Sequence, residues 1–274
     1  MELPPPPPTT AKELIALHGA AIGSCPAILE NVDLQITPGS RLLLMGRNGS
    51  GRSALLSALA GKLKCSIGTR TVGERWLQLL HWDQSARDLP AEEDETPTDF
   101  ILRLAGSSAA GEESTVLAML NDVGIDRFAA RRPVGCLSSG ERTLTALTAL
   151  CFAPKHLLLL DEPFAFLGAA AVERLAEALS PARWPGTLVY TTSSRAAAES
   201  LQPSCFAIVG KGRVVLHDRP PCDADWRAVH EAEIEEAVHA SREDEHQDHE
   251  AAGATNEAKR QKVDGSSPVR QVEQ

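Results

Sequence analysis

The residues best suited to chemistry stand at positions 46–53, with the sequence GRNGSGRS. Glycines let a backbone wrap closely around a phosphate group, and the N–H groups at a helix N-terminus attract negative charge. An apolar run precedes this stretch over residues 41–45, and a helical pattern follows it over residues 52–63. The pattern predicts a phosphate-binding loop in which the Ser53 hydroxyl binds Mg²⁺. The predicted binding residues are Gly46, Arg47, Asn48, Gly49, Ser50, Gly51, Arg52 and Ser53.

Position 52 departs from the P-loop pattern, because this chain has Arg52 where the pattern has lysine. Arginine keeps the positive charge, but its wide planar guanidinium does not fit a phosphate cradle as a compact ammonium does. We therefore expect phosphate binding to survive and catalysis to fall. The alternative interpretation of the stretch is a glycine-rich turn between a strand and a helix that binds no phosphate.

Two adjacent acids, Asp161 and Glu162, follow four leucines at residues 157–160. Phosphoryl transfer needs one carboxylate near Mg²⁺ and a second one that orients or deprotonates the attacking water. Acids at the carboxyl end of a buried strand meet both needs, so we expect Asp161 to bind the metal and Glu162 to be catalytic. By itself, an apolar strand followed by two acids is common and mostly structural, so this assignment depends on the residues that precede it.

The segment before these acids is Leu137-Ser138-Ser139-Gly140-Glu141, which begins 24 positions before Asp161. Alone, it is typical of a helix N-cap with a glutamate in the first turn. Between a P-loop and an acidic strand, it resembles the LSGGQ or LSGGE signature of ATP-binding-cassette (ABC) ATPases. The resemblance implies Mg·ATP as the ligand and a nucleotide sandwiched against Ser138 and Gly140 of a second cassette. That cassette is either a second copy of this chain or another cassette protein.

Within this family the chain is most similar to a single cassette of the F subfamily, whose members often act on ribosomes. The similarity extends over residues 13–215, and it is strongest over residues 28–61. Trp82-Asp83-Gln84 looks like the Q-loop of the subfamily, which implies that Gln84 senses metal and water. The resemblance thus gives Gln84 a catalytic and a metal-binding role, and it makes the ribosome a candidate partner.

Three departures from the subfamily pattern concern the mechanism. The DEPTNHLD segment of the subfamily ends in aspartate where this chain has Gly168, and a VSHDR-like segment has histidine where this chain has Ser193. Residues 20–29 contain no aromatic side chain to stack on adenine, a loss worth on the order of 1 kcal/mol. We expect weakened communication between cassettes, slow hydrolysis and poor selectivity for adenine.

The period of the apolar residues predicts an α/β fold, with short strands and helices alternating over residues 13–217. Three helices without an intervening strand, over residues 96–152, indicate an inserted helical subdomain. The predicted fold class is a P-loop NTPase core of ABC type with a β-rich subdomain and a helical signature subdomain. The expected strands are 14–17, 28–36, 41–45, 77–82, 156–160, 187–191, 206–209 and 213–217, and the expected helices are 52–63, 98–105, 113–123, 140–152, 169–179 and 195–201.

Composition divides the chain into a proline-rich, disordered N-terminus (1–11), a cassette domain (12–225), and an acidic helix with a disordered tail (226–274). The net charge of −10, of which twelve acidic and six basic residues beyond Trp226 contribute −6, argues against broad binding to nucleic acid. No export signal and no apolar run of roughly 20 residues is present. The six cysteines form no CxxC pair, which favours reduced thiols in a cytoplasmic protein. The basic run at residues 259–262 is a weak signal for the nucleus.

We therefore expect a protein that binds Mg·ATP and hydrolyses it slowly to drive association with, or remodelling of, a partner. One alternative is a regulatory or ribosome-associated module that binds ATP without hydrolysis, which Arg52, Gly168 and Ser193 favour. A second alternative is the ATPase subunit of a transporter. The intact Gln84 and Glu162 favour the enzyme.

Overall fold

The computed structural model describes residues 3–24, 26–83, 94–105 and 112–230. Its central element is a six-stranded sheet, in which the first five strands are parallel and the last is antiparallel to its neighbour. Three of these strands are buried along their whole length, as expected for a parallel sheet covered on both faces. The strand order is β5 (Leu79–Trp82), β6 (Leu157–Leu160), β7 (Thr187–Thr191), β3 (Arg41–Met45), β8 (Cys205–Gly210) and β9 (Arg213–His217).

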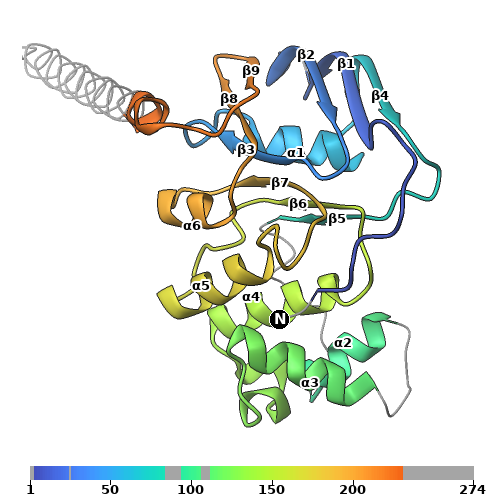
Figure 1. The fold of residues 1–274 in the computed structure, drawn as a ribbon, viewed down its shortest axis with the longest axis vertical. Coiled ribbons are helices and arrows are strands. Elements are labelled where there is room, and N and C mark those ends of the chain that lie inside the picture. The colour runs from blue at the N-terminus through green and yellow to red at the C-terminus, as the bar shows by residue number, and fades with distance from the viewer. Residues whose placement is uncertain (1–2, 25, 84–93, 106–111, 231–274) are drawn as a thin grey trace, which may run out of the picture. The chain divides into compact units, whose positions relative to one another are not determined.

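A smaller antiparallel sheet, in the order β2 (Leu29–Ile36), β1 (Ile15–Ile22) and β4 (Cys65–Val72), packs against α1 (Arg52–Ala60). Figure 1 shows α1 between the two sheets. The helix buries Leu55, Leu56 and Leu59 in a core to which both sheets contribute. The start of α1, and the loop that leads into it, are therefore held from two sides.

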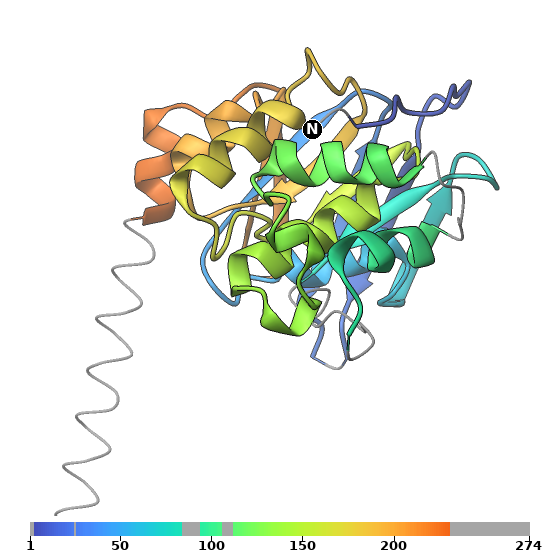
Figure 2. The ribbon, with the colours of Figure 1, turned by 90° about the horizontal axis from the view of Figure 1, so that it is seen from below.

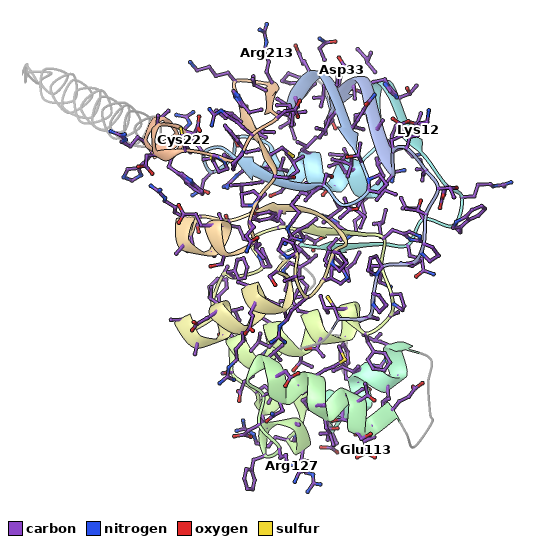
Figure 3. The ribbon with its side chains drawn as sticks, in the orientation of Figure 1. Lys12, Asp33, Glu113, Arg127, Arg213 and Cys222 are labelled. Atoms are coloured by element: carbon purple, nitrogen blue, oxygen red, sulfur yellow. The ribbon has the colours of Figure 1, made fainter. Side chains whose placement is uncertain are left out.

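Helices cover the other face of the large sheet (Figures 1 and 2). Among the described residues, α2 (Pro97–Ala105), α3 (Glu112–Val123) and α4 (Ser139–Cys151) follow one another without a strand, and α2 packs against both of the others. Figure 3 shows the side chains of Glu113 and Arg127 on this helical subdomain, at the opposite end of the domain from Asp33 and Arg213. The later helices α5 (Ala169–Ala178) and α6 (Arg195–Ser200) pack against each other. The predicted fold class is thus confirmed.

The strand β4 is absent from the sequence prediction, and β1 is longer than predicted. Six of the eight residues of β4 are exposed, because it is an edge strand with little contact to the core. An exposed edge strand lacks the apolar alternation on which strand prediction depends. The β-branched side chains of Ile67, Thr69, Thr71 and Val72 are the signal that could have identified it.

The N-terminal segment differs from the expectation of disorder over residues 1–11, because its described part, residues 3–11, packs on the domain. Leu3 is buried and lines a small cavity together with Cys151 and Trp184. The backbone N–H groups of Thr10 and Ala11 both donate to Glu74 Oε1, at 3.1 Å. Consecutive prolines restrict the unfolded chain, so a few anchors are enough to order such a segment.

Residues 227–274 form a second unit. Of this unit the structure describes residues 227–230, which are the end of a helix that begins at residue 223. The rest of the expected acidic helix, the tail and the basic run at residues 259–262 lie outside the described residues. In the described part of the chain, no helix is both long and apolar enough to cross a bilayer. The cysteines with described positions are free thiols, as predicted: Cys65, Cys136, Cys151, Cys205 and Cys222.

Candidate active site

The P-loop and the two acids meet because β3, β6 and β7 are adjacent parallel strands that end at the same edge of the sheet. Leu44 of β3 pairs with Thr191 of β7, and Leu160 of β6 pairs with Tyr190. β3 leads directly into the P-loop and β6 into Asp161 and Glu162, whereas β7 leads to Ser193, one of the departures noted in the sequence. The carboxyl edge of this sheet therefore gathers the P-loop, Asp161 and Glu162, and the segment after Thr191.

The P-loop depends on glycine at points where its backbone turns sharply or packs closely against other elements. A Cβ atom at Gly46, where φ is 151°, would lie 2.2 Å from the carbonyl oxygen of Val209. Gly49 and Gly51 have φ values of 77° and 104°, in the left-handed region that favours glycine. Ser50 Oγ is buried and has no hydrogen-bond partner among the described residues. A buried hydroxyl without a partner, in a loop at a helix N-terminus, fits a phosphate as the missing acceptor.

Arg52 is the first residue of α1 and is directed toward the acids rather than into solvent. Its guanidinium donates to Asn48 Oδ1 at 3.1 Å and forms an ion pair with Glu162 Oε1 at 3.6 Å. The Arg52 side chain is 12% exposed and that of Glu162 is 18% exposed. The cation that the sequence assigns to phosphate thus also contacts the predicted catalytic carboxylate.

Asp161 and Glu162 are held by the end of β7. The Thr191 hydroxyl donates to Asp161 Oδ1 at 2.7 Å and accepts the backbone N–H of Glu162 at 2.8 Å. Glu162 has a φ of 47°, which is uncommon for a residue other than glycine. Its Oε2 accepts the backbone N–H of Ser193 at 3.0 Å and the Ser193 hydroxyl at 3.4 Å. Thr191 is missing from the sequence prediction, although a threonine that ends an otherwise apolar strand is a usable signal.

The oxygen donors near this edge suit Mg²⁺, which prefers carboxylate and hydroxyl oxygens. Ser53 is exposed at the start of α1, and Asp161 is 5% exposed at the end of β6. The Asp161 backbone N–H donates to the Trp82 carbonyl at 2.9 Å, so β5 ends beside the acids. Gln84, the predicted sensor of metal and water, lies outside the described residues.

The end of β5 also brings a buried histidine close to the site. Neither ring nitrogen of His81 has a hydrogen-bond partner among the described residues, and Nδ1 lies 3.6 Å from Asp83 Oδ2. Asp83 in turn pairs with Lys62 at 2.9 Å. Burial lowers the pKa of His81, the nearby Lys62 charge lowers it further, and Asp83 and Asp161 oppose this effect. His81 is therefore stabilised as a neutral side chain.

The signature residues form a separate local structure at the start of α4. Ser138 Oγ accepts the backbone N–H of Glu141 at 3.3 Å, and Glu141 Oε2 accepts the backbone N–H of Ser138 at 2.8 Å, which completes a capping box. Hydrogen bonds from the Ser138 backbone and hydroxyl lower the pKa of Glu141. A Cβ atom at Gly140 would lie 3.2 Å from the Phe166 carbonyl oxygen. Among the described residues, the hydrogen bonds of Ser138 stay within the first turns of α4 and do not connect the signature to the P-loop.

The three sequence departures have distinct surroundings. Gly168 is the N-cap of α5 and provides no side-chain cap, while Phe166, two residues earlier, is 67% exposed with a φ of 68°. Ser193 contacts Glu162 as described above. In the segment without aromatics, Ile28 is 46% exposed and lies against the P-loop, since a Cβ atom at Gly51 would approach its Cγ2 to 3.0 Å. In the segment that lacks an aromatic residue for stacking on adenine, the side chain next to the P-loop is therefore the aliphatic Ile28.

Comparison with known proteins connects this geometry to a family. A family model described as ABC transporter matches residues 29–165, which is half of the chain. The ABC transporter F family member 4 of Arabidopsis thaliana is 33% identical over 152 residues, which cover 55% of this chain and 21% of that protein. The ATP-binding protein Uup of Caulobacter vibrioides is 32% identical over 190 residues, which cover 69% and 30% respectively. The chain thus spans less than a third of the length of these two relatives.

Solved structures agree on the fold. The dimeric structure of a bacterial ABC transporter cassette is similar with a TM-score of 0.64 at 19% identity, and the match covers 76% of this chain and all of that one. At this identity the likeness shows the fold alone. With the family match, and with a glycine-rich loop of P-loop type beside paired acids, it follows that this chain belongs to the ABC transporter family and is an ATP-binding cassette of that family.

Proposed function

We propose that this cassette binds Mg·ATP where β3, β6 and β7 end, and hydrolyses it slowly to drive association with, or remodelling of, a partner. The observation that carries the proposal is the buried Ser50 hydroxyl, without a partner among the described residues, in a loop at the N-terminus of α1 that lies next to Asp161 and Glu162. The backbone of residues 46–51 and the Arg52 guanidinium hold the β and γ phosphates. Ser53 and Asp161 supply oxygen ligands for Mg²⁺, which when bound neutralises charge on the phosphates.

The remaining roles concern the attacking water. Glu162 orients or deprotonates it, and Gln84 contacts water and metal. Slow hydrolysis follows from two departures that act on the same phosphate, the guanidinium at Arg52 and the missing imidazole at Ser193. Selection of adenine over guanine is weak, because Ile28 cannot stack on a base as an aromatic ring does.

We further propose that the nucleotide is enclosed by a second cassette, supplied by another copy of this chain or by a different cassette protein. The support is that, among the described residues, the hydrogen bonds of Ser138 stay within α4 and Gly140 lies against the Phe166 carbonyl rather than the P-loop. A signature without hydrogen bonds to the P-loop among the described residues of its own chain is consistent with one that acts across an interface. Gly168, which has no side chain, weakens communication through that interface.

One specific observation favours a second candidate, a regulatory module that binds ATP without hydrolysing it. Both oxygens of the Glu162 carboxylate are engaged, Oε1 by Arg52 and Oε2 by Ser193. A carboxylate held in this way is a poor base unless ATP draws Arg52 away. In a regulatory module of this kind, ATP binding controls association with a partner. The ribosome is one candidate partner, because F-subfamily members often act on it. The ATPase subunit of a transporter remains the less favoured reading.

Two measurements on the purified full chain test the proposal. Millimolar Mg·ATP is expected to raise the melting temperature, because a ligand at about 100 times its Kd stabilises the folded state by about 2.7 kcal/mol, and GTP is expected to act nearly as well. Phosphate release is expected to be measurable and to disappear in Glu162→Gln, while Glu173→Gln, a change on the exposed face of α5, leaves it intact. Binding without any phosphate release favours the regulatory module, and no binding refutes both candidates.

A further inference from the structure

Thr191 holds a position that the proposed mechanism does not yet use. It is the last residue of β7 and has no exposed surface. Its hydroxyl makes two directional bonds, one as donor to Asp161 Oδ1 and one as acceptor from the Glu162 backbone N–H. One hydroxyl therefore connects the predicted metal ligand to the backbone of the predicted base.

Each of these bonds has a consequence for the acid that it contacts. A hydroxyl donor on Oδ1 fixes the rotation of the Asp161 carboxylate and leaves Oδ2 for another ligand. The Glu162 N–H belongs to a residue with φ of 47°, a conformation that persists only where its surroundings enforce it. Without an acceptor, this N–H would be left without its partner at a costly position. Thr191 thus orients one acid and stabilises the backbone of the other.

The sheet gives Thr191 little freedom to move. Its backbone pairs with Leu44 of β3, the strand that leads into the P-loop. Two residues later, Ser193 also bonds to Glu162, through its backbone N–H at 3.0 Å and its hydroxyl at 3.4 Å. The end of β7 and the residues after it therefore contact the two acids at more than one point.

We propose that Thr191 is a positioning residue, whose hydroxyl holds Asp161 and Glu162 in the arrangement that Mg·ATP requires. This inference rests on the proposed function. It assigns Thr191 no contact with substrate, since its hydroxyl is already used by the two acids. Loss of an outer partner of a metal ligand typically lowers metal affinity or activity by about 10- to 100-fold.

The test compares Thr191→Val, which keeps shape and removes the hydroxyl, with Thr191→Ser, which keeps the hydroxyl. Thr148→Val is the matched control, because Thr148 is equally buried and its hydroxyl donates to the Leu144 carbonyl within α4, away from the two acids. The primary measurement is the Mg²⁺ concentration that gives half-maximal binding of a fluorescent ATP analogue to the full chain. Melting temperature, and kcat and KM for phosphate release, are measured in parallel.

Thr191→Val is expected to raise the half-maximal Mg²⁺ concentration by about tenfold and to lower kcat with little change in KM. Thr191→Ser, which keeps the hydroxyl, is expected to stay close to the wild-type Mg²⁺ concentration and kcat. Thr148→Val is expected to change the melting temperature without changing the Mg²⁺ dependence. If Thr191→Val does not fold, Thr191→Cys, which has a weaker donor of similar size, replaces it and is expected to show an intermediate Mg²⁺ dependence.

Equal Mg²⁺ dependence in Thr191→Val and Thr148→Val, or a serine variant no better than valine, overturns the role of Thr191 while leaving ATP binding in place. Wild-type protein that binds no nucleotide refutes the proposed function itself, and the role of Thr191 with it. The two failures are therefore distinguishable.

Discussion

The two helices that carry the nucleotide motifs begin in different ways. At the start of α1 the N-cap is Gly51, in a left-handed conformation and without a side-chain hydrogen bond. At the start of α4 the N-cap is Ser138, which forms a capping box with Glu141. The first N–H groups of a helix need acceptors, and a side-chain cap supplies one internally. α1 therefore keeps its N-terminus available to an anion, whereas α4 satisfies part of its own.

In the function proposed above, this difference separates the P-loop site, which a single chain supplies, from the signature, which acts with a second cassette. The P-loop is flanked by residues of other elements, with Val209 behind Gly46 and Glu162 beside Arg52. The signature is supported by its own first turn and by the Phe166 carbonyl near Gly140. We infer that binding of phosphate is a property of the single cassette, and that the signature acts only with a partner.

The largest expected effect distinguishes the glycines of these two motifs. Gly46→Ala is expected to destabilise the fold by roughly 2 to 5 kcal/mol and to abolish nucleotide binding, because the added Cβ would lie 2.2 Å from a backbone oxygen. Gly140→Ala is expected to stay within about 1 kcal/mol of wild type, since alanine favours the helix and the contact at 3.2 Å needs only a small shift. Urea denaturation and ATP titration measure both variants. Similar losses in the two would remove the distinction between the motifs.

A second prediction concerns rate. Loss of one well-aimed donor or cation typically costs about 10² to 10³ in rate, so Arg52→Lys together with Ser193→His is expected to raise turnover by on the order of 10². The gain of the double variant should exceed that of either change alone, because both act on one transferred group. Steady-state phosphate release measures it, with Glu162→Gln added as the control that abolishes the gain. Turnover at background in the double variant, with ATP still bound, would place the defect at Gly168 or in a missing partner.

A third, smaller effect examines the capping box. Ser138→Ala is expected to cost about 1 kcal/mol of stability near neutral pH and to leave nucleotide binding by the single cassette unchanged. Because the folded state lowers the pKa of Glu141, the stability that this carboxylate contributes is present above its ordinary pKa of 4.5 and is lost as pH falls through the folded value. The difference between variant and wild type should therefore shrink on acidification. Denaturation curves at neutral and acidic pH measure this difference in stability. A difference that does not depend on pH would show that the Glu141 carboxylate does not contribute to the cap.

The smallest effect is expected at His81, which lies at the end of β5 close to the P-loop site. Burial lowers its pKa in the folded state, so the unfolded state binds more protons and stability is lost as pH falls from 6.5 toward the folded value. His81→Leu is expected to flatten this part of the stability profile. Melting temperatures between pH 7.5 and 5, in roughly half-unit steps, measure it against a variant of the exposed His18. An unchanged slope in His81→Leu would assign the pH dependence to another group.

Sequence reasoning found the elements of this cassette more readily than the contacts of its site. The P-loop and the acidic strand follow from patterns that are local in the chain, glycines before a helix and four leucines before Asp161. β4 was missed because an exposed edge strand has no apolar period, and the packing of residues 3–11 was missed because Glu74, which anchors it, is more than 60 residues away. Local patterns carry no information about partners at that separation.

By itself the sequence determined the family, the order of the helices and of every strand except β4, and the residue types available for phosphate, metal and water, because these depend on spacing along the chain. The tertiary structure alone decided which of them meet. Parallel pairing of β3, β6 and β7 brings Thr191 to Asp161 and Arg52 to Glu162 across 30 and 110 residues of sequence, and it leaves Ser138 to bond within α4. The physical reason is that strand register, which arises from packing of the whole core, sets the position of every side chain at the edge of the sheet.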